Sequence, residues 1–158
     1  MEHGREVPTV EDETRPYWEA AKQGRLLVKR CNACGKVHHY PRPFCPSCWD
    51  EDVEWHEVSG LGTVYTYSIV FRNDLAPFSE WGAYVPAVVE LDEGPRIMTN
   101  IVDCNHEQLS VGMRVEVAFR DLTGEWAAPV FRPATASGAG SGAGSGAGAG
   151  AAGERGIS

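Results

Sequence analysis

Hydrophobic and polar residues alternate along most of the chain after residue 60, and this two-residue period predicts short β-strands. In the first segment, residues 62–72, four large side chains are expected to share one face: Tyr65, Tyr67, Ile69 and Phe71. Residues 85–91 and 96–103 predict a hairpin, because the turn sequence Asp-Glu-Gly-Pro separates them. The clearest alternation, in residues 113–120, places four apolar side chains inward: Met113, Val115, Val117 and Phe119.

A fifth and weaker strand is predicted over residues 126–133, where Pro129 favours a strand edge or a bulge. The segment 105–112, between the third and fourth strands, has room for about one helical turn before Gly112. Five strands with a helical turn in this place favour the OB-fold, a small Greek-key barrel. An SH3-like barrel or an open β-sandwich would have a similar number of strands, and both stay open as alternatives.

A short helix is predicted ahead of the strands, over residues 9–24. Pro16 is tolerated in a first helical turn, and Gly24 suits the end of the helix. The adjacent Tyr17 and Trp18 cannot both lie on one narrow stripe of a helix. We therefore expect the helix to contact two surfaces, one in its own domain and the other on a partner protein.

Four of the five cysteines form a Cys-x2-Cys pair that is repeated after ten residues: Cys31, Cys34, Cys45 and Cys48. A two-residue gap lets both thiolates of a tight turn face one ion, and two such turns supply four ligands for tetrahedral zinc. Two disulfides are the alternative, which a reducing cytoplasm would disfavour. Because four thiolates leave no coordination position for water, the pattern predicts one structural Zn²⁺ rather than a catalytic ion.

The residues around the cysteines extend this prediction to a zinc ribbon over residues 25–59. Gly35 directly follows the first pair, where the backbone often needs a positive φ. Trp49 occupies the place of Gly35 in the second pair, so we expect the second turn to end differently. His38 and His39 lie between the two pairs and are expected to be surface side chains rather than ligands.

The predicted fold is therefore mainly β, in four parts. An N-terminal segment and helix (1–24) and the zinc ribbon (25–59) precede a five-stranded OB-fold barrel (60–136) and a tail (137–158). The tail holds half of the 18 glycines and otherwise consists mostly of alanine and serine. Such a composition supplies little apolar area to offset the entropy of ordering, so the tail is expected to be a disordered linker or terminus.

Charge and hydropathy narrow the classes of function. The formal charge is −8, and the barrel region alone carries five basic and ten acidic residues, which disfavours binding to nucleic-acid phosphates. No apolar run approaches the roughly 20 residues of a membrane span, and the first residues lack a hydrophobic signal core. A cytoplasmic location is therefore expected.

The fifth cysteine, Cys104, lies near Asp103 and His106 in the sequence. Because sequence adjacency is weak evidence for a nucleophile, we expect Cys104 to be a half-buried thiol.

The order and spacing of all these segments resemble one bacterial and archaeal family. The resemblance rests on the Tyr-Trp helix, LLVKRCNACGKVHHYPRPFCPSC, GTVYTYSIV, VPAVVELDEGPRI, LSVGMRVEVAF and PVFRP. Together these segments, over residues 9–133, are similar to the zinc-ribbon/OB-fold acyl-CoA-associated proteins, formerly a domain of unknown function. The resemblance implies a rubredoxin-like ribbon and an accessory subunit of thiolase-superfamily enzymes, including aldolases that remove steroid side chains as acyl-CoA units.

On this resemblance, the chain is expected to be a non-catalytic subunit of a hetero-oligomer. Its ribbon and helix would dock on a thiolase or retro-aldol lyase, and its barrel would cover part of the acyl-CoA channel of that enzyme. The chain lacks the GxSxG and HExxH motifs and the phosphate loop GxxxxGK[ST], in agreement with a required subunit rather than an enzyme that acts alone. The residues expected to contact acyl-CoA or the partner are Tyr17, Trp18, Arg42, Arg72, Phe78, Trp81 and Tyr84.

Two other readings of the residues stay open. The aromatic loop 73–84 can form an interface or a ligand lid, or it can close one end of the barrel. For the whole chain, the alternatives are a protein that binds single-stranded nucleic acid through barrel aromatics, and a stand-alone acyl-CoA-binding protein or hydrolase.

Overall fold

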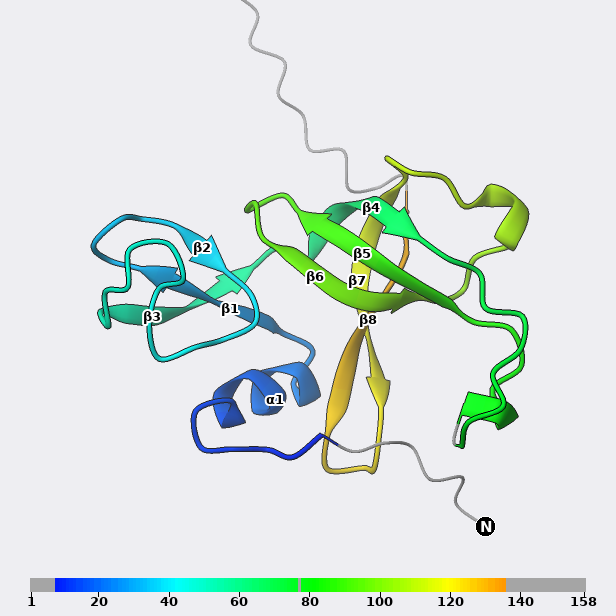
Figure 1. The fold of residues 1–158 in the computed structure, drawn as a ribbon, viewed down its shortest axis with the longest axis horizontal. Helices are drawn as coiled ribbons and strands as arrows, with labels where there is room; N and C mark the ends of the chain where they lie inside the picture. Colours follow the sequence, from blue (N-terminus) through cyan, green and yellow to red (C-terminus); the bar gives the residue numbers. More distant parts are fainter. Residues whose placement is uncertain (1–7, 77, 136–158) are drawn as a thin grey trace, which may run out of the picture.

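The computed structural model describes residues 8–76 and 78–135, in which a three-stranded ribbon is joined to a closed five-stranded barrel (Figure 1). The elements in chain order are α1 (Arg15–Lys22), β1 (Leu26–Cys31), β2 (Val37–His38), β3 (Val53–Val58), β4 (Leu61–Tyr67), η1 (Phe78–Glu80), β5 (Val85–Leu91), β6 (Arg96–Ile101), η2 (His106–Gln108), β7 (Arg114–Asp121) and β8 (Ala127–Pro133). The mainly β fold with one N-terminal helix is as predicted. The predicted tail over residues 137–158 lies outside the described residues.

Helix α1 is shorter than the sequence predicts. Thr14 at its N-cap makes no side-chain capping bond, because its hydroxyl donates to the carbonyl of Glu11 instead. The end is as predicted: Gly24 has φ +77°, and its N–H donates to the carbonyl of Ala21 at 3.1 Å. Arg25 N–H donates to the carbonyl of Ala20 at 2.9 Å, which completes a Schellman motif and turns the chain sharply into β1.

The ribbon is an antiparallel sheet in the order β2-β1-β3. Strands β1 and β3 stay in register from Leu26↔Val58 to Cys31↔Val53. The inward side chains of β1, Leu26 and Val28, are fully buried, as the period of a half-buried strand requires. This pairing fixes Cys31 at the far end of the ribbon, where the two cysteine turns meet.

The barrel has the strand order β4-β5-β6-β8-β7 and closes by pairing of β7 with β4. All pairs are antiparallel except β6 with β8, which meet at Ile101↔Phe131. The short helix η2 lies between the third and fourth barrel strands, and Gly112 follows it with φ +85°. This arrangement is that of an OB-fold, as predicted. Large buried side chains from the barrel strands fill the interior: Val64, Val85, Val89, Leu91, Ile97, Ile101, Val115 and Phe131.

Strand β4 departs from its predicted alternation at Tyr65. The register with β5 shifts immediately after Val64, so that Tyr65 is the extra residue of a bulge. Val64 is buried and Tyr67 packs against the core, whereas the exposed ring of Tyr65 lies under the guanidinium of Arg96 at 3.6 Å. The prediction that Tyr65 and Phe71 share a face with Tyr67 is wrong, since Phe71 lies beyond the strand and is 73% exposed.

The hairpin β7–β8 extends beyond the barrel towards α1 (Figure 1). Strand β8 pairs with β7 along its whole length but with β6 only at Phe131, so Pro129 lies where β8 has a single neighbouring strand. This is the edge position that the sequence predicts for Pro129. Lys22 at the end of α1 forms an ion pair with Asp121 of β7 at 3.2 Å, which ties the helix to this hairpin.

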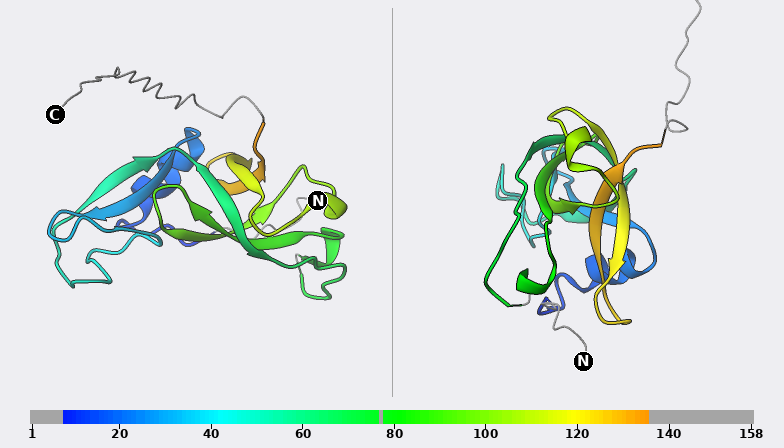
Figure 2. Two further views of the ribbon diagram at one scale, coloured as in Figure 1. Left: turned by 90° about the horizontal axis from the view of Figure 1, so that it is seen from above. Right: turned by 90° about the vertical axis from the view of Figure 1, so that its right-hand side faces the viewer.

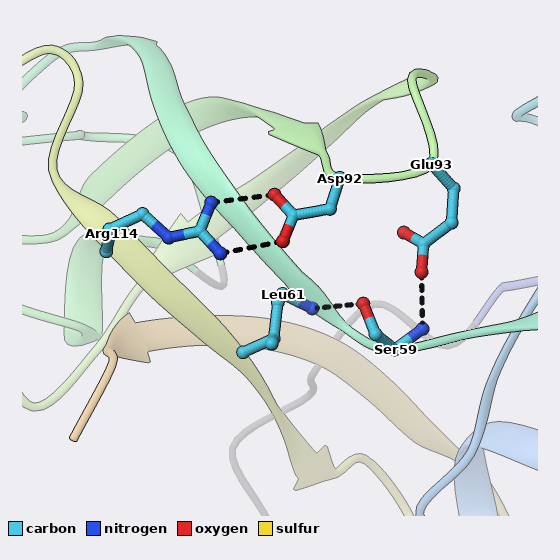
Figure 3. Close-up of polar contacts among 5 residues, drawn as sticks. All are labelled: Ser59, Leu61, Asp92, Glu93 and Arg114. Carbon is cyan, nitrogen blue, oxygen red and sulfur yellow. Dashed lines mark hydrogen bonds and ion pairs between the residues drawn. The ribbon is translucent and has the colours of Figure 1, made fainter. Parts of the chain in front are cut away.

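Only Ser59 and Gly60 connect the ribbon strand β3 to the barrel strand β4, and polar contacts hold this connection (Figure 3). Ser59 N–H donates to the carboxylate of Glu93 at 2.7 Å, and Leu61 N–H donates to the hydroxyl of Ser59 at 3.2 Å. Beside them, the guanidinium of Arg114 donates two bonds of 2.7 Å to the carboxylate of Asp92. The ribbon therefore leaves the barrel in a fixed direction.

Ribbon, helix and barrel share one hydrophobic core. Tyr17 of α1 and the ribbon residues Leu26, Val28 and Val58 belong to the same buried cluster as the barrel interior. The left view of Figure 2 shows the ribbon and the barrel end to end, and in the right view the barrel lies in front of the ribbon. The molecule is thus a barrel with a rigid arm, and α1 packs against both.

Candidate metal centre and binding surfaces

The four predicted ligands meet at the tip of the ribbon. The Sγ atoms of Cys31, Cys34, Cys45 and Cys48 all lie within 4.8 Å of one another. The Cys31–Cys48 and Cys34–Cys45 Sγ distances are both 3.6 Å. A tetrahedron with metal–sulfur bonds of about 2.3 Å has edges of about 3.8 Å, so the four thiols fit one such ion. The donor set is a closed four-cysteine structural site for a metal, and it offers no position for a substrate.

The two cysteine turns have the same backbone geometry. The carbonyl of Cys31 accepts from the N–H of Gly35 and that of Cys45 accepts from the N–H of Trp49, both at 2.9 Å. The residue after each turn has a left-handed backbone conformation, with φ +72° at Gly35 and +66° at Trp49. The expectation that the second turn ends differently is therefore wrong, because Trp49 adopts the conformation that glycine adopts in the first.

The backbone also favours the thiolate form of one ligand. The backbone N–H groups of Cys48 and Ser47 face the sulfur of Cys45 and lower the pKa of that thiol to about 6. A thiol with a lowered pKa gives up its proton to a metal more readily at neutral pH. The turn thus stabilises the negatively charged form of Cys45, one of the four ligands that a divalent cation would require.

The two histidines between the cysteine pairs are not surface side chains, contrary to expectation. His38 is only 7% exposed, and neither of its ring nitrogens has a hydrogen-bond partner in the described part of the chain. Burial, with the charges of Lys29 and Arg42, lowers the pKa of His38. His39 is half-buried against Tyr17, with its Nε2 3.4 Å from the tyrosine hydroxyl. Both histidines pack the base of the ribbon, and neither belongs to the four-cysteine cluster.

Tyr17 and Trp18 contact the two surfaces that their adjacency requires, and both surfaces belong to this chain. Tyr17 is 3% exposed and packs edge-to-face against Tyr40 of the ribbon loop, and Trp18 packs against the shared hydrophobic core. A cavity of about 570 Å³ opens where helix, ribbon and barrel meet. Met98 and Pro129 form part of its barrel wall. A contact of Tyr17 or Trp18 with another molecule stays a prediction, and this cavity is where it would occur.

The aromatic residues of loop 73–84 gather into one cluster. The ring centroid of Phe78 lies 4.9 Å from that of Trp81 and 6.2 Å from that of Tyr84. The guanidinium of Arg120 lies over Trp81, 4.9 Å from its ring centroid. Trp81 and Tyr84 line a second cavity, of about 380 Å³, together with Cys104. The cluster is half-buried and leaves an open hollow beside it, so it can both close the barrel end and border a ligand.

The two arginines that were expected to contact acyl-CoA or the partner, Arg42 and Arg72, lie apart from these cavities. Arg72 is exposed and forms an ion pair with Asp74 at 2.8 Å, which partly neutralises it. Arg42 is exposed on the ribbon loop near His38. Neither residue lines the cavity beside the aromatic cluster or the cavity at the helix.

Sequence reasoning did not identify Asn100 and Arg120, which line both cavities. Their strands alternate like any other barrel strand, so no sequence signal distinguishes them. The Oδ1 of Asn100 and the Nε1 of Trp18 are buried without a hydrogen-bond partner among the described residues. Cys104 is the expected half-buried thiol: its Sγ donates to the carbonyl of Asn105, and burial raises its pKa, which disfavours a nucleophilic thiolate.

Two family models match consecutive parts of the chain. Residues 18–54 match a rubredoxin-like zinc ribbon domain of ChsH2, and residues 55–120 match the C-terminal OB-fold domain of ChsH2. Among solved structures, the chain is similar to a chain of an Ltp2-ChsH2(DUF35) aldolase, with 38% identity and a TM-score of 0.72. That match covers 82% of this chain and 100% of the solved one.

Curated relatives fall into two groups. A DUF35 domain-containing scaffold protein of Methanocaldococcus jannaschii is 43% identical over 65% of this chain and 74% of its own length. A probable enoyl-CoA hydratase alpha subunit of Thermomonospora curvata is 40% identical, and a 3-oxo-4,17-pregnadiene-20-carboxyl-CoA hydratase alpha subunit of Mycobacterium tuberculosis is 28% identical. This chain matches 39% of the length of each hydratase subunit.

Within the described part of the chain, every helix falls short of the length and hydrophobicity that a membrane span requires.

Proposed function

The chain belongs to the ChsH2 (DUF35) family, in which a rubredoxin-like zinc ribbon precedes an OB-fold domain, and we propose that it is a non-catalytic accessory subunit of a thiolase-superfamily enzyme. The observation that carries this proposal is the similarity to a chain of the Ltp2-ChsH2(DUF35) aldolase, which extends over the whole of that chain. The name of the archaeal relatives, scaffold proteins, agrees with a supporting role.

The geometry supports such a role. The four-cysteine cluster is closed, and Cys104 is held as a thiol, so neither offers a site of turnover. The ribbon is a stiff arm, because the Ser59–Gly60 connection and a shared core fix it to the barrel. A protein of this shape is suited to hold a second subunit in a defined orientation.

The metal in this proposal is one structural Zn²⁺ held by the four cysteines. Tetrahedral thiolate coordination is the usual environment of structural zinc, and the sulfur–sulfur distances of 3.6 Å match it. Zinc would lock the two cysteine turns together. It would not take part in the chemistry of the partner.

The substrate in this proposal is an acyl-CoA in the channel of the partner enzyme, with a steroid side chain as the acyl group. The names of the hydratase relatives refer to CoA thioesters, and one of them names a steroid. The aromatic cluster of Phe78, Trp81 and Tyr84 and the adjoining cavity of about 380 Å³ form the part of the barrel that we assign to this channel.

Co-expression tests the proposal directly. The full-length chain and a thiolase-superfamily protein of the same genome are expected to elute as one complex in size-exclusion chromatography with light scattering. The complex is expected to cleave a β-hydroxyacyl-CoA, and each subunit alone is expected to be inactive. Separate elution of the two proteins, or turnover of the acyl-CoA by this chain alone, would overturn the proposal and favour a stand-alone acyl-CoA-binding protein or hydrolase.

A further inference from the structure

Trp49 is the most unusual residue at the ribbon tip. Its backbone is left-handed, with φ +66°, although the residue is large and aromatic. Its side chain is 73% exposed, next to the ligand Cys48. Both properties act against the residue, because bulky side chains disfavour this conformation and indole rings favour burial. A residue that folding disfavours in two ways calls for a role outside the folding of this chain.

The first cysteine turn shows what folding alone would select. Gly35 has the same place, the same hydrogen bond to its turn and nearly the same φ. A Cβ atom added to Gly35 would meet no other atom within 4 Å, so the first turn requires no side chain at this place for packing. The equivalence indicates that glycine would satisfy the turn at position 49 equally well, and that the indole serves another purpose.

A neighbouring ring holds the indole of Trp49 in one orientation. One of its faces stacks on Phe44, with ring centroids 5.5 Å apart and an angle of 20° between the planes. The chain continues directly into three exposed acidic residues, Asp50, Glu51 and Asp52. The tip therefore presents a flat apolar group with a negatively charged border. Trp is one of the residue types that are enriched at the energetic hot spots of protein interfaces.

We propose that Trp49 is the anchor by which the ribbon tip binds a second protein, which offers an apolar pocket bordered by lysine or arginine side chains. The inference rests on the proposed function, because the expected second protein is the thiolase-superfamily subunit. The acidic border selects a basic pocket rim, and the −8 charge of the whole chain acts in the same direction. Stacking on Phe44 reduces the entropy that the indole loses on binding.

The substitution Trp49→Gly separates docking from folding, since the two are expected to change in opposite directions. Glycine relieves the left-handed strain, so the melting temperature of the free chain should stay the same or rise. The dissociation constant of the complex with the thiolase-like subunit, measured by calorimetry with the full-length chain, should increase at least about tenfold. Raising the ionic strength should weaken the wild-type complex, because salt screens the charged rim.

Phe71→Ala is the matched control, because Phe71 is an aromatic side chain with the same 73% exposure outside the ribbon. It should leave the affinity unchanged. Wild-type affinity in Trp49→Gly, a lower melting temperature of this variant, an equal loss in Phe71→Ala, or an affinity insensitive to salt would each overturn the inference. If the wild-type chain itself fails to bind any thiolase-superfamily subunit, the proposed function fails instead, and this distinguishes the two.

Discussion

At the scale of single residues, Tyr17 and His39 link the helix to the base of the ribbon. The tyrosine hydroxyl and the histidine Nε2 lie 3.4 Å apart in a half-buried contact. Burial and the nearby Tyr40 raise the pKa of Tyr17, and burial together with His38 lowers the pKa of His39 to about 4. Both side chains are therefore neutral at neutral pH.

The lowered pKa of His39 predicts a loss of stability in acid. The unfolded chain binds this proton below about pH 6.5, whereas the folded chain binds it only near pH 4, so the free energy of unfolding falls as the pH decreases through that window. The contribution is on the order of 3 kcal/mol at most. In urea unfolding at pH 7 and pH 4.5, His39→Gln should lose less stability than the wild type. Cysteine protonation affects both proteins, so equal losses would contradict the prediction.

The positions of single side chains could be predicted from the sequence only where nearby residues in the chain determine them. The spacing of Cys31, Cys34, Cys45 and Cys48 determines their convergence, because each pair is a four-residue turn. His38 lies in strand β2 opposite Lys29, and its burial depends on tertiary packing around this short strand, to which no local preference points. The left-handed Trp49 contradicts the conformational preference of its own residue type, so sequence reasoning predicts the wrong turn for it.

At the scale of elements, close backbone approach determines where the barrel tolerates a side chain. Gly62 of β4 lies beside β5, with which it pairs. A Cβ atom at Gly62 would be 2.5 Å from the carbonyl oxygen of Glu90 and 2.8 Å from the Cγ1 of Val89. The backbone oxygen cannot move without breaking the β4–β5 pairing. The bulge that follows at Tyr65 then bends the strand around the barrel.

Gly62→Ala should therefore destabilise the barrel by about 1–3 kcal/mol in urea unfolding, the usual cost of overpacking. Gly82→Ala is a suitable control, because a Cβ atom at Gly82 meets nothing within 4 Å and only its φ of +67° disfavours alanine. That variant should lose about 1 kcal/mol. A smaller loss in Gly62→Ala than in Gly82→Ala would show that β4 can move away from β5.

The strand pattern predicted the elements better than their details. Strands β5 to β8, the turn η2 and the break at Gly112 follow from alternation and glycine placement. The bulge in β4 was not predictable, because Tyr65 and Tyr67 have the same apolar character and only the pairing with β5 places one outside and the other inside.

At the scale of the whole molecule, the ribbon and the barrel share one core, so we expect them to unfold together. Tyr17, Leu26 and Val58 pack into the cluster that also fills the barrel. Sequence reasoning identified both modules but not their relative orientation. That orientation depends on contacts between distant segments, such as the Lys22–Asp121 ion pair and the bond from Ser59 to Glu93.

Loss of the metal should therefore reduce the stability of barrel strands that lie far from the cysteines. Cys34→Ala removes one ligand, and binding of structural zinc contributes on the order of 10 kcal/mol to folding. The variant should lose the metal, and hydrogen exchange should become faster both in the ribbon strands β1 and β3 and in the barrel strands β5 and β6. Cys104→Ala, outside the cluster, should keep the metal and the protection of both. Faster exchange confined to the ribbon would contradict a shared core.

The two-residue connection between β3 and β4 has a mechanical consequence. Strand β3 spans about 20 Å and continues into a barrel strand with only Ser59 and Gly60 between them. The bond from Ser59 to Glu93 fixes this connection at the wall of the barrel, so the ribbon and the barrel would rotate together as one body. A protein that bound Trp49 would therefore also set the orientation of the barrel.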